Sequence, residues 1–144
     1  MENISFDREN VKADWSIRLM NRSSSLNDDT HYQQTIQNPE NHFPSPALFV
    51  YTLANIVTGE LCIRHKIGGE SSFFVFEEFS AEKLYTIATH GFLADPNMNV
   101  LICGWVEYGI ADEPDILLLM LERDAEGIEK DTFIRKINDS YYQN

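Results

Sequence analysis

The stretch that decides the fold is Ser45-Pro-Ala-Leu-Phe-Val-Tyr-Thr-Leu-Ala-Asn-Ile-Val-Thr-Gly-Glu-Leu-Cys-Ile-Arg-His-Lys-Ile-Gly-Gly69. Ser45 is a good N-cap and proline is favoured at the first helical position, so a helix is predicted from Ala47 to about Lys66. This helix is apolar on most sides, which is typical of a buried helix. Gly68 and Gly69 are predicted to end it.

Downstream, the pattern predicts a strand, a helix and two more strands. Ser72–Phe76 is a run of β-formers without alternation, as in a strand buried on both faces. Ser80 is the expected N-cap of a helix over Ala81–Phe92, and Val100–Val106 is the next strand. One stripe of that helix is predicted to consist of Leu84, Ile87, Ala88 and Gly91. Because strand, helix and strand follow closely, we expect a right-handed βαβ unit. A third strand, Asp115–Glu122, follows too soon for a helical crossover and should pair antiparallel.

Upstream, alternating apolar residues over Trp15–Met20 predict a short strand with one buried face. Residues 21–44 are rich in Ser, Asn, Asp and Gln and are predicted to form a long polar loop, with a weak helix near Tyr32. The charged C-terminal stretch is expected to form a helix or strand around Thr132–Ile137. No repeat or linker is visible, so residues 1–144 are interpreted as one α/β domain, a mixed sheet packed on the buried helix.

Charge excludes two classes of partner. The chain has 23 acidic and 11 basic side chains and a formal net charge of −12, which would repel nucleic acid and anionic membrane surfaces. No apolar run is long enough to span a bilayer, and the first residues do not resemble a secretion signal. Cys62 and Cys103 each lie in an apolar run and are expected to be free thiols. These features predict a cytoplasmic protein.

A resemblance to the β-ketoacyl-acyl-carrier-protein synthase family is carried by nine positions in order. They are Thr52, Leu53, Asn55, Gly59, Ile63, Arg64, His65, Gly69 and Ser71. Cys103-Gly-Trp-Val-Glu107 is similar to a later strand motif of that family, and Leu121-Glu122 resembles the end of the next strand. The resemblance implies a partial thiolase-like fold, the N-terminal half of a ketosynthase. It also implies structural roles for Thr52, Asn55, Gly59, Arg64, His65 and Gly69.

The chain departs from the family at the position of the nucleophilic cysteine. Counting from Gly69, the resemblance places that cysteine at Glu78, in Val75-Phe-Glu-Glu-Phe-Ser80, where no thiol is present. A carboxylate at a helix start is favoured by the helix dipole but is a poor acyl acceptor. We therefore expect no catalytic residue, no cofactor and no metal site in this chain. The resemblance is to a cysteine-less subunit of the chain-length-factor type.

Two sharper interpretations of this segment remain as alternatives. Glu77 and Glu78 could form an acid/base pair, although stabilising negative charge in the first turn of the helix that begins at Ala81 is the better explanation of them. Ser80 could be a displaced nucleophile, although a serine in this position is more often an N-cap. The four histidines show no spacing typical of metal ligands.

The aromatic residues on both sides of Glu77 and Glu78 suggest an interface. In thiolase-like enzymes the strand before the nucleophile pairs with its mate across the dimer. If this holds here, an edge strand would offer backbone and apolar groups to a partner or to an acyl tunnel. Core and interface roles are compatible for this set: Ser72, Phe73, Phe74, Val75, Phe76 and Phe79.

The favoured function is a non-catalytic ketosynthase-like partner subunit in fatty-acid-like or polyketide-like chain elongation. The resemblance implies a homodimer or a heterodimer with an active ketosynthase, and an acyl carrier protein as a further partner. Because carrier proteins are acidic too, docking would need a basic patch, for example around Arg64 and Lys66. A stand-alone homodimeric acyl-binding or scaffolding protein is the alternative. A hydrolase or acyltransferase using Glu78 or Ser80 ranks third.

Overall fold

The computed structural model describes residues 10–40, 43–108, 114–124 and 126–143. It has an α/β fold with a mixed sheet of four strands, as predicted. The elements, in chain order, are β1 (Trp15–Asn21), α1 (Leu26–Ile36), α2 (Pro46–Tyr51), α3 (Ile56–His65), β2 (Ser71–Val75), α4 (Ala81–Ala94), β3 (Val100–Tyr108), β4 (Pro114–Glu122) and α5 (Lys130–Tyr142).

The strand order is β2-β1-β3-β4, so β1 lies between the two strands of the predicted βαβ unit. β1 is parallel to both neighbours: Leu19 faces Phe73 of β2 and Gly104 of β3. β4 pairs antiparallel with β3, as the short connection indicated. The expectation of one buried face on β1 was wrong. Ser16 and Arg18 are buried like their apolar neighbours Ile17 and Leu19, because the strand is central and both sheet faces are covered.

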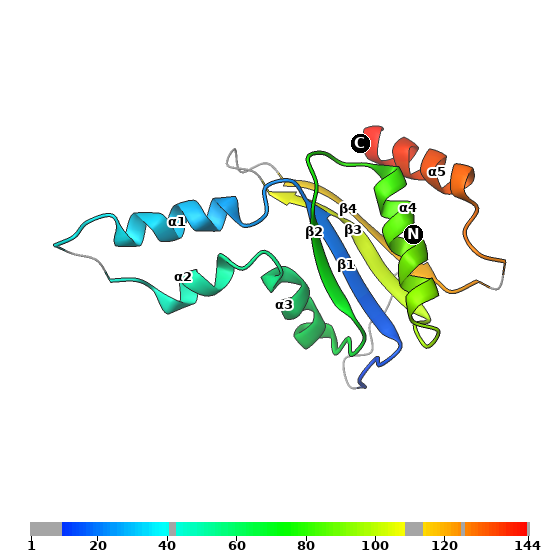
Figure 1. The fold of residues 1–144 in the computed structure, drawn as a ribbon, viewed down its shortest axis with the longest axis horizontal. Coiled ribbons are helices and arrows are strands. Elements are labelled where there is room, and N and C mark those ends of the chain that lie inside the picture. Colours follow the sequence, from blue (N-terminus) through cyan, green and yellow to red (C-terminus); the bar gives the residue numbers. More distant parts are fainter. Residues whose placement is uncertain (1–9, 41–42, 109–113, 125, 144) are drawn as a thin grey trace.

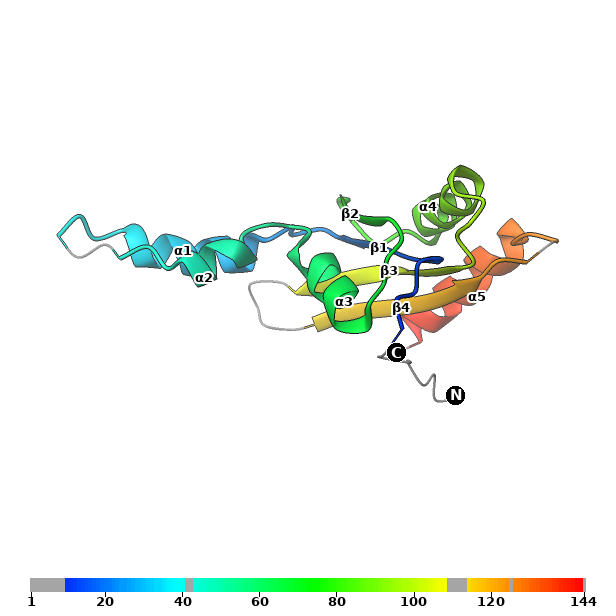
Figure 2. The same ribbon diagram turned by 90° about the horizontal axis from the view of Figure 1, so that it is seen from below.

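Helices lie on both faces of the sheet (Figures 1 and 2). α3 packs on the face that carries Leu19, whereas α4 and α5 pack on the face that carries Met20. The predicted stripe of α4 is buried, and α5 adds two buried side chains to the same core. These residues are Leu84, Ile87, Ala88, Gly91, Phe133 and Ile137.

The single buried helix predicted from Ala47 to Lys66 was wrong. Two helices stand there, α2 and α3, separated at Thr52–Asn55. Pro46 and the Ser45 cap begin α2 as predicted, with the Ser45 hydroxyl accepting from the N–H of Leu48. No residue of α2 is buried and Thr58 alone is buried in α3. The apolar character of α2 therefore belongs to a surface, on a helical hairpin that projects from the sheet (Figure 1).

Residues 21–44 are not a long loop, because they contain the 11-residue helix α1. The weak helix predicted near Tyr32 is thus confirmed, although its sequence has no apolar stripe and none of its residues is buried. α1 lies beside α2 in both views, and the ring of Tyr32 lies 5.5 Å from that of Phe49.

The turn before β2 uses its glycines differently from the prediction. Helix α3 ends on Lys66, which adopts the left-handed conformation at φ 54° and donates its N–H to Cys62. Gly69 instead allows a close approach: a Cβ there would lie 2.3 Å from the carbonyl oxygen of Trp15. Gly59, in contrast, has no neighbouring atom within 4 Å of its Cβ position.

Gly69→Ala should destabilise the fold, because the methyl group would force β1 and the turn apart; we expect a loss of about 1–3 kcal/mol. Gly59→Ala is the matched control, since alanine in an open helical position should stabilise by ~0.5–1 kcal/mol. Urea unfolding followed by tryptophan fluorescence measures both changes. Equal effects of the two substitutions would contradict the close approach at Gly69.

Candidate functional site

The loop that joins β2 to α4 carries the residues predicted to replace a nucleophile. It follows the carboxyl end of a parallel strand, the edge of α/β sheets where sites are commonly found. Glu77 and Glu78 are exposed on this loop. Both residues were expected to lie in the first turn of α4. They lie outside it, because they precede the N-cap residue Ser80. Ser80 is the cap, accepting from the N–H of Lys83 at 3.3 Å, as predicted.

Beneath the loop, an aromatic cluster closes the core. Phe79 is buried, and its ring stacks on that of Tyr141 with centroids 3.8 Å apart. Trp105 meets Phe79 edge-on at 6.0 Å. The indole N–H of Trp105 and the hydroxyl of Tyr141 both donate to Asp115. Burial, together with this acceptor, raises the pKa of Tyr141 above its ordinary value. The last turn of α5 is thus held against Phe79 of the loop and Asp115 of β4 by Tyr141.

Neither cysteine lies at this loop. Cys62 is within α3 and half-buried, and burial raises the pKa of its thiol, opposed by a hydrogen bond with Ser71. Cys103 is in the middle of β3, where burial raises its pKa to about 12. Both thiols are therefore protonated at neutral pH, and a protonated thiol is a weak nucleophile.

β2 is an edge strand, as the interface interpretation required, and it is half-buried rather than buried on both faces. Phe74 and Phe76 pack against the core under α4, their rings nearly parallel and 6.3 Å apart. Phe73 points to the opposite face, and Val75 is 52% exposed. The hydroxyl of Ser72 donates to Glu70 at 2.8 Å. Within the aromatic segment, Phe74 and Phe76 therefore contact the core, whereas Val75 is exposed at the edge strand.

A cavity of about 330 Å³ lies between the sheet and the helices α1, α2 and α3. Its walls are mainly apolar, with Leu19 and Phe73 from strands β1 and β2, Val57 from α3, and Ile116 and Leu118 from β4. Polar groups gather at its end by the carboxyl edge of β1, from Asn21 to Asp28. An apolar site with few polar groups suits a ligand with a hydrocarbon body.

Glu107 holds the chain that borders this cavity. Its Oε2 accepts from the N–H groups of Arg22 at 2.6 Å and Ser23 at 3.0 Å, just after β1. Its Oε1 is buried without a hydrogen-bond partner among the described residues. Burial favours a raised pKa for Glu107, but the hydrogen bonds from Ser23 and Arg22 outweigh it and lower the pKa below its ordinary value. The carboxylate is thus an ionised anchor.

The motif residues expected to be structural lie along one path. Thr52 occupies the C-cap position of α2. Asn55 occupies the N-cap position of α3 without a side-chain cap hydrogen bond, and Arg64 and His65 lie in the last turn of α3. Together with Gly59 and Gly69 they connect the projecting hairpin to β2. Sequence reasoning missed Asp115 and Tyr141, whose pairing brings together residues 26 apart. It also missed Arg18, which the alternation of β1 placed toward solvent.

Among the described residues, no group of three or more His, Cys, Asp and Glu side chains is arranged to hold a metal ion. In the same part of the chain, no helix is both long and apolar enough to cross a membrane. His42 lies outside the described residues, and so do residues 1–9, which were judged not to resemble a secretion signal.

Comparisons with known proteins identify the fold. The structure is similar to a ketosynthase (ApeO) in complex with its chain length factor (ApeC) from Xenorhabdus doucetiae, with a TM-score of 0.60 and 18% identity over 82% of this chain and 52% of that one. It is also similar to the ishigamide ketosynthase/chain length factor, with a TM-score of 0.65 and 13% identity over 84% of this chain and 38% of that one. The chain thus spans about half or less of the structures it matches. No protein-family profile and no curated protein sequence matches it. The fold is therefore part of a thiolase-like, ketosynthase-like fold, as the motif predicted.

Replacing Glu107 tests the anchor. Glu107→Ala leaves the part-buried N–H groups of Arg22 and Ser23 without their acceptor and should destabilise the fold by about 1–3 kcal/mol at neutral pH. Because the folded-state pKa of Glu107 is lowered, its contribution is complete above the unfolded pKa of about 4.3 and is lost as pH falls through the folded value. Glu107→Gln should therefore lose less stability than the wild type on acidification. Identical pH dependence of the urea midpoint in both proteins would contradict this.

Proposed function

We propose that this chain is a non-catalytic, ketosynthase-like partner subunit for an active ketosynthase. The observation that carries the proposal is the content of the loop between β2 and α4. Two exposed glutamates and a buried phenylalanine occupy the segment to which the motif register assigns the family nucleophile, and both thiols of the chain lie elsewhere.

Condensation needs a thiolate to accept the acyl group and polar donors to support the reaction. A carboxylate at Glu78 has neither the nucleophilicity of a thiolate nor the charge to stabilise an oxyanion. The described histidines also lie on other parts of the chain: His31 in α1, His65 in the last turn of α3 and His90 near the C-terminal end of α4. This arrangement supports a subunit that contributes surface rather than chemistry.

The surface available to a partner is the β2 edge together with α2. Within the described part of the chain, β2 has a neighbouring strand on one side only, and strand addition is a common mode of association. α2 adds exposed apolar side chains, among them Phe49, which is 52% exposed, and Val50, which is 42% exposed. Covering such a helix removes apolar area from water, which drives association. Both similar structures are named as ketosynthases together with a chain length factor, which fits a ketosynthase partner.

The setting we infer is elongation of a fatty-acid-like or polyketide-like chain on an acyl carrier protein. No cofactor is required for the proposed role. A carrier protein would have to approach a chain of net charge −12, so its docking would depend on local cations. Arg64 and Lys66 are exposed at the end of α3 and are the candidates for that contact.

A second candidate is a homodimeric acyl-binding or scaffolding protein, and the apolar cavity favours it. A volume of about 330 Å³ is in the range of small-molecule sites. Under this alternative the chain would bind fatty acyl groups without any ketosynthase. An enzyme that uses Glu78 or Ser80 ranks third, because the Ser80 hydroxyl already caps α4.

Val75→Lys tests the proposed partner edge. Tagged wild-type chain, purified from its native cells, should bring down a ketosynthase that has its active-site cysteine. Lysine at the 52% exposed Val75 should reduce that yield by about tenfold, because edge lysines disfavour strand pairing. Leu93→Lys is the matched control, since Leu93 is 79% exposed on α4 and lies away from β2.

Mass spectrometry of the captured proteins, quantified against the wild type, provides the measurement. Recovery of the chain without any ketosynthase would contradict the proposal, and fatty-acid binding by that isolated chain would then support the second candidate. Equal loss of the partner in Val75→Lys and Leu93→Lys would exclude β2 as the contact.

A further inference from the structure

The cavity between the sheet and the helices α1, α2 and α3 has a charge of one sign. Two of its lining residues are acidic, Asp28 of α1 and Glu107 of β3, and none of the described residues that line it is Lys, Arg or His. The other walls are mainly apolar, around a volume of about 330 Å³. A ligand with a carboxylate head would meet two carboxylates here and no cation, whereas a cationic head would be attracted.

Glu107 also has an acceptor to spare. The residue is only 5% exposed, and its Oε2 already accepts from the N–H groups of Arg22 and Ser23. Its Oε1 is buried and has no hydrogen-bond partner among the described residues. A buried acceptor without a donor costs free energy, and the cost is greater for a carboxylate. A donor placed in the cavity beside Glu107 would remove that cost.

Nearby polar groups of the lining are engaged with each other or with the backbone. The amide nitrogen of Asn21 donates to the carbonyl of Ser24, and the N–H of Ser24 donates to Oδ1 of Asn21, both at 2.9 Å. The hydroxyl of Ser25 donates to the carbonyl of Thr52 at 2.7 Å. Arg22 helps to lower the pKa of Glu107, but it is not a lining residue of the cavity. These groups therefore leave Oε1 of Glu107 to a bound molecule.

We propose that this cavity binds a primary amine with an unbranched hydrocarbon chain, whose ammonium group donates to Oε1 of Glu107. An ammonium group offers three donors and a positive charge, and hydrogen bonds between charged groups are the stronger ones. The hydrocarbon chain would lie along the apolar walls formed by Val57 of α3 and by Ile116 and Leu118 of β4. An alcohol of the same length supplies a donor without the charge, and a fatty acid supplies the wrong charge.

This site does not rest on the proposed function, because binding of an amine requires neither a ketosynthase nor the β2 edge. It also differs from the second candidate function in the head of the ligand, which is a cation here and an acyl group there. Capture of a ketosynthase and binding of an amine can therefore succeed or fail separately.

Isothermal titration calorimetry of the purified chain at neutral pH tests the ligand class with three probes of equal length: decylamine, decanol and decanoate. We expect decylamine to bind about tenfold or more tightly than decanol, because only the ammonium makes a charge-assisted hydrogen bond, and decanoate to bind most weakly. Octylamine and hexylamine should bind more weakly than decylamine, by about fourfold for each methylene removed. Equal affinity for the three probes, or no binding of decylamine, would overturn the proposal.

Substitutions separate this site from a general attraction of cations to a chain of net charge −12. Glu107→Gln keeps one oxygen for the N–H groups after β1 and removes the charge, so decylamine should bind about tenfold more weakly. Val57→Phe fills the cavity and should weaken decylamine binding by a similar factor. Ile63→Phe is the matched control, since Ile63 is on the same helix, is 82% exposed and does not line the cavity. Wild-type affinity for decylamine in both Glu107→Gln and Val57→Phe, or an equal loss in Ile63→Phe, would refute the site.

Discussion

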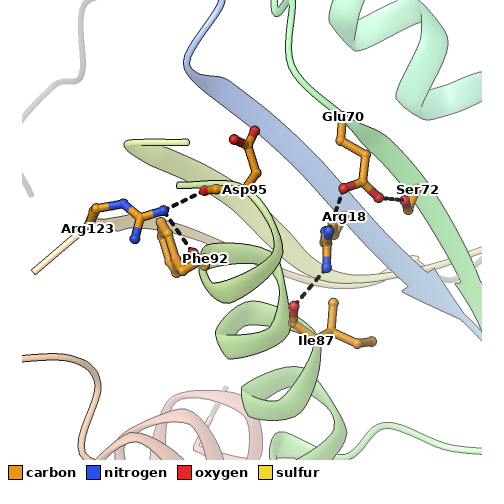
Figure 3. A network of polar contacts seen from close by, with 7 residues as sticks. All are labelled: Arg18, Glu70, Ser72, Ile87, Phe92, Asp95 and Arg123. Atoms are coloured by element: carbon orange, nitrogen blue, oxygen red, sulfur yellow. Dashed lines mark hydrogen bonds and ion pairs between the residues drawn. The ribbon is translucent and has the colours of Figure 1, made fainter. Parts of the chain in front are cut away.

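The arrangement of the molecule depends on one buried cation, Arg18 in the central strand. Its guanidinium donates to Glu70 at 2.6 Å, ahead of β2, and to the carbonyl of Ile87 in α4 at 3.1 Å (Figure 3). The arginine side chain is 8% exposed and that of Glu70 51%. Gly91 makes room for it, since a Cβ there would lie 3.1 Å from the guanidinium carbon. A buried charge left without its partners is costly, so these contacts fix β1, β2 and α4 together. At the C-terminal end of α4, the exposed Arg123 donates to the carbonyls of Phe92 and Asp95 and so links the residue after β4 to the end of α4 (Figure 3).

The central position of β1 has consequences for function. Because β1 has β2 on one side and β3 on the other, the chain must cross from β2 over α4 to reach β3. That crossing creates the loop with Glu77 and Glu78 at the carboxyl edge of the sheet, and it leaves β2 at one border. On the opposite face the excursion through α1, α2 and α3 forms the apolar cavity. The candidate surfaces are thus direct results of strand order.

Much of the fold could be predicted from local signals. The caps at Ser45 and Ser80, the stripe of α4 and the antiparallel pairing of the last two strands all depend on short-range patterns, and the structure confirms them. The motif from Thr52 to Ser71 led to the correct fold, and one of its residues, Gly69, is required by the close approach of Trp15.

The predictions that were wrong, and the contacts that were missed, depended on residues far apart in the sequence. α1 has no apolar stripe of its own, so its sequence predicted only a weak helix near Tyr32 within a polar loop. α2 is apolar without being covered by the described residues, so its composition predicted a buried helix. Arg18 and Ser16 were assigned to solvent because alternation cannot tell an edge strand from a central one. The cluster of Asp115, Trp105 and Tyr141 joins three elements, and nothing in the local sequence indicates their pairing.

The central claim is that this fold supports association without acyl transfer, and intact-mass spectrometry tests it most directly. The purified chain would be incubated with an acyl-thioester donor, quenched and weighed, with an active ketosynthase as the positive control. The account predicts that the mass of the chain stays unchanged while that of the control increases by one acyl group. A stable adduct mapped to Glu78, Ser80, Cys62 or Cys103 would contradict it.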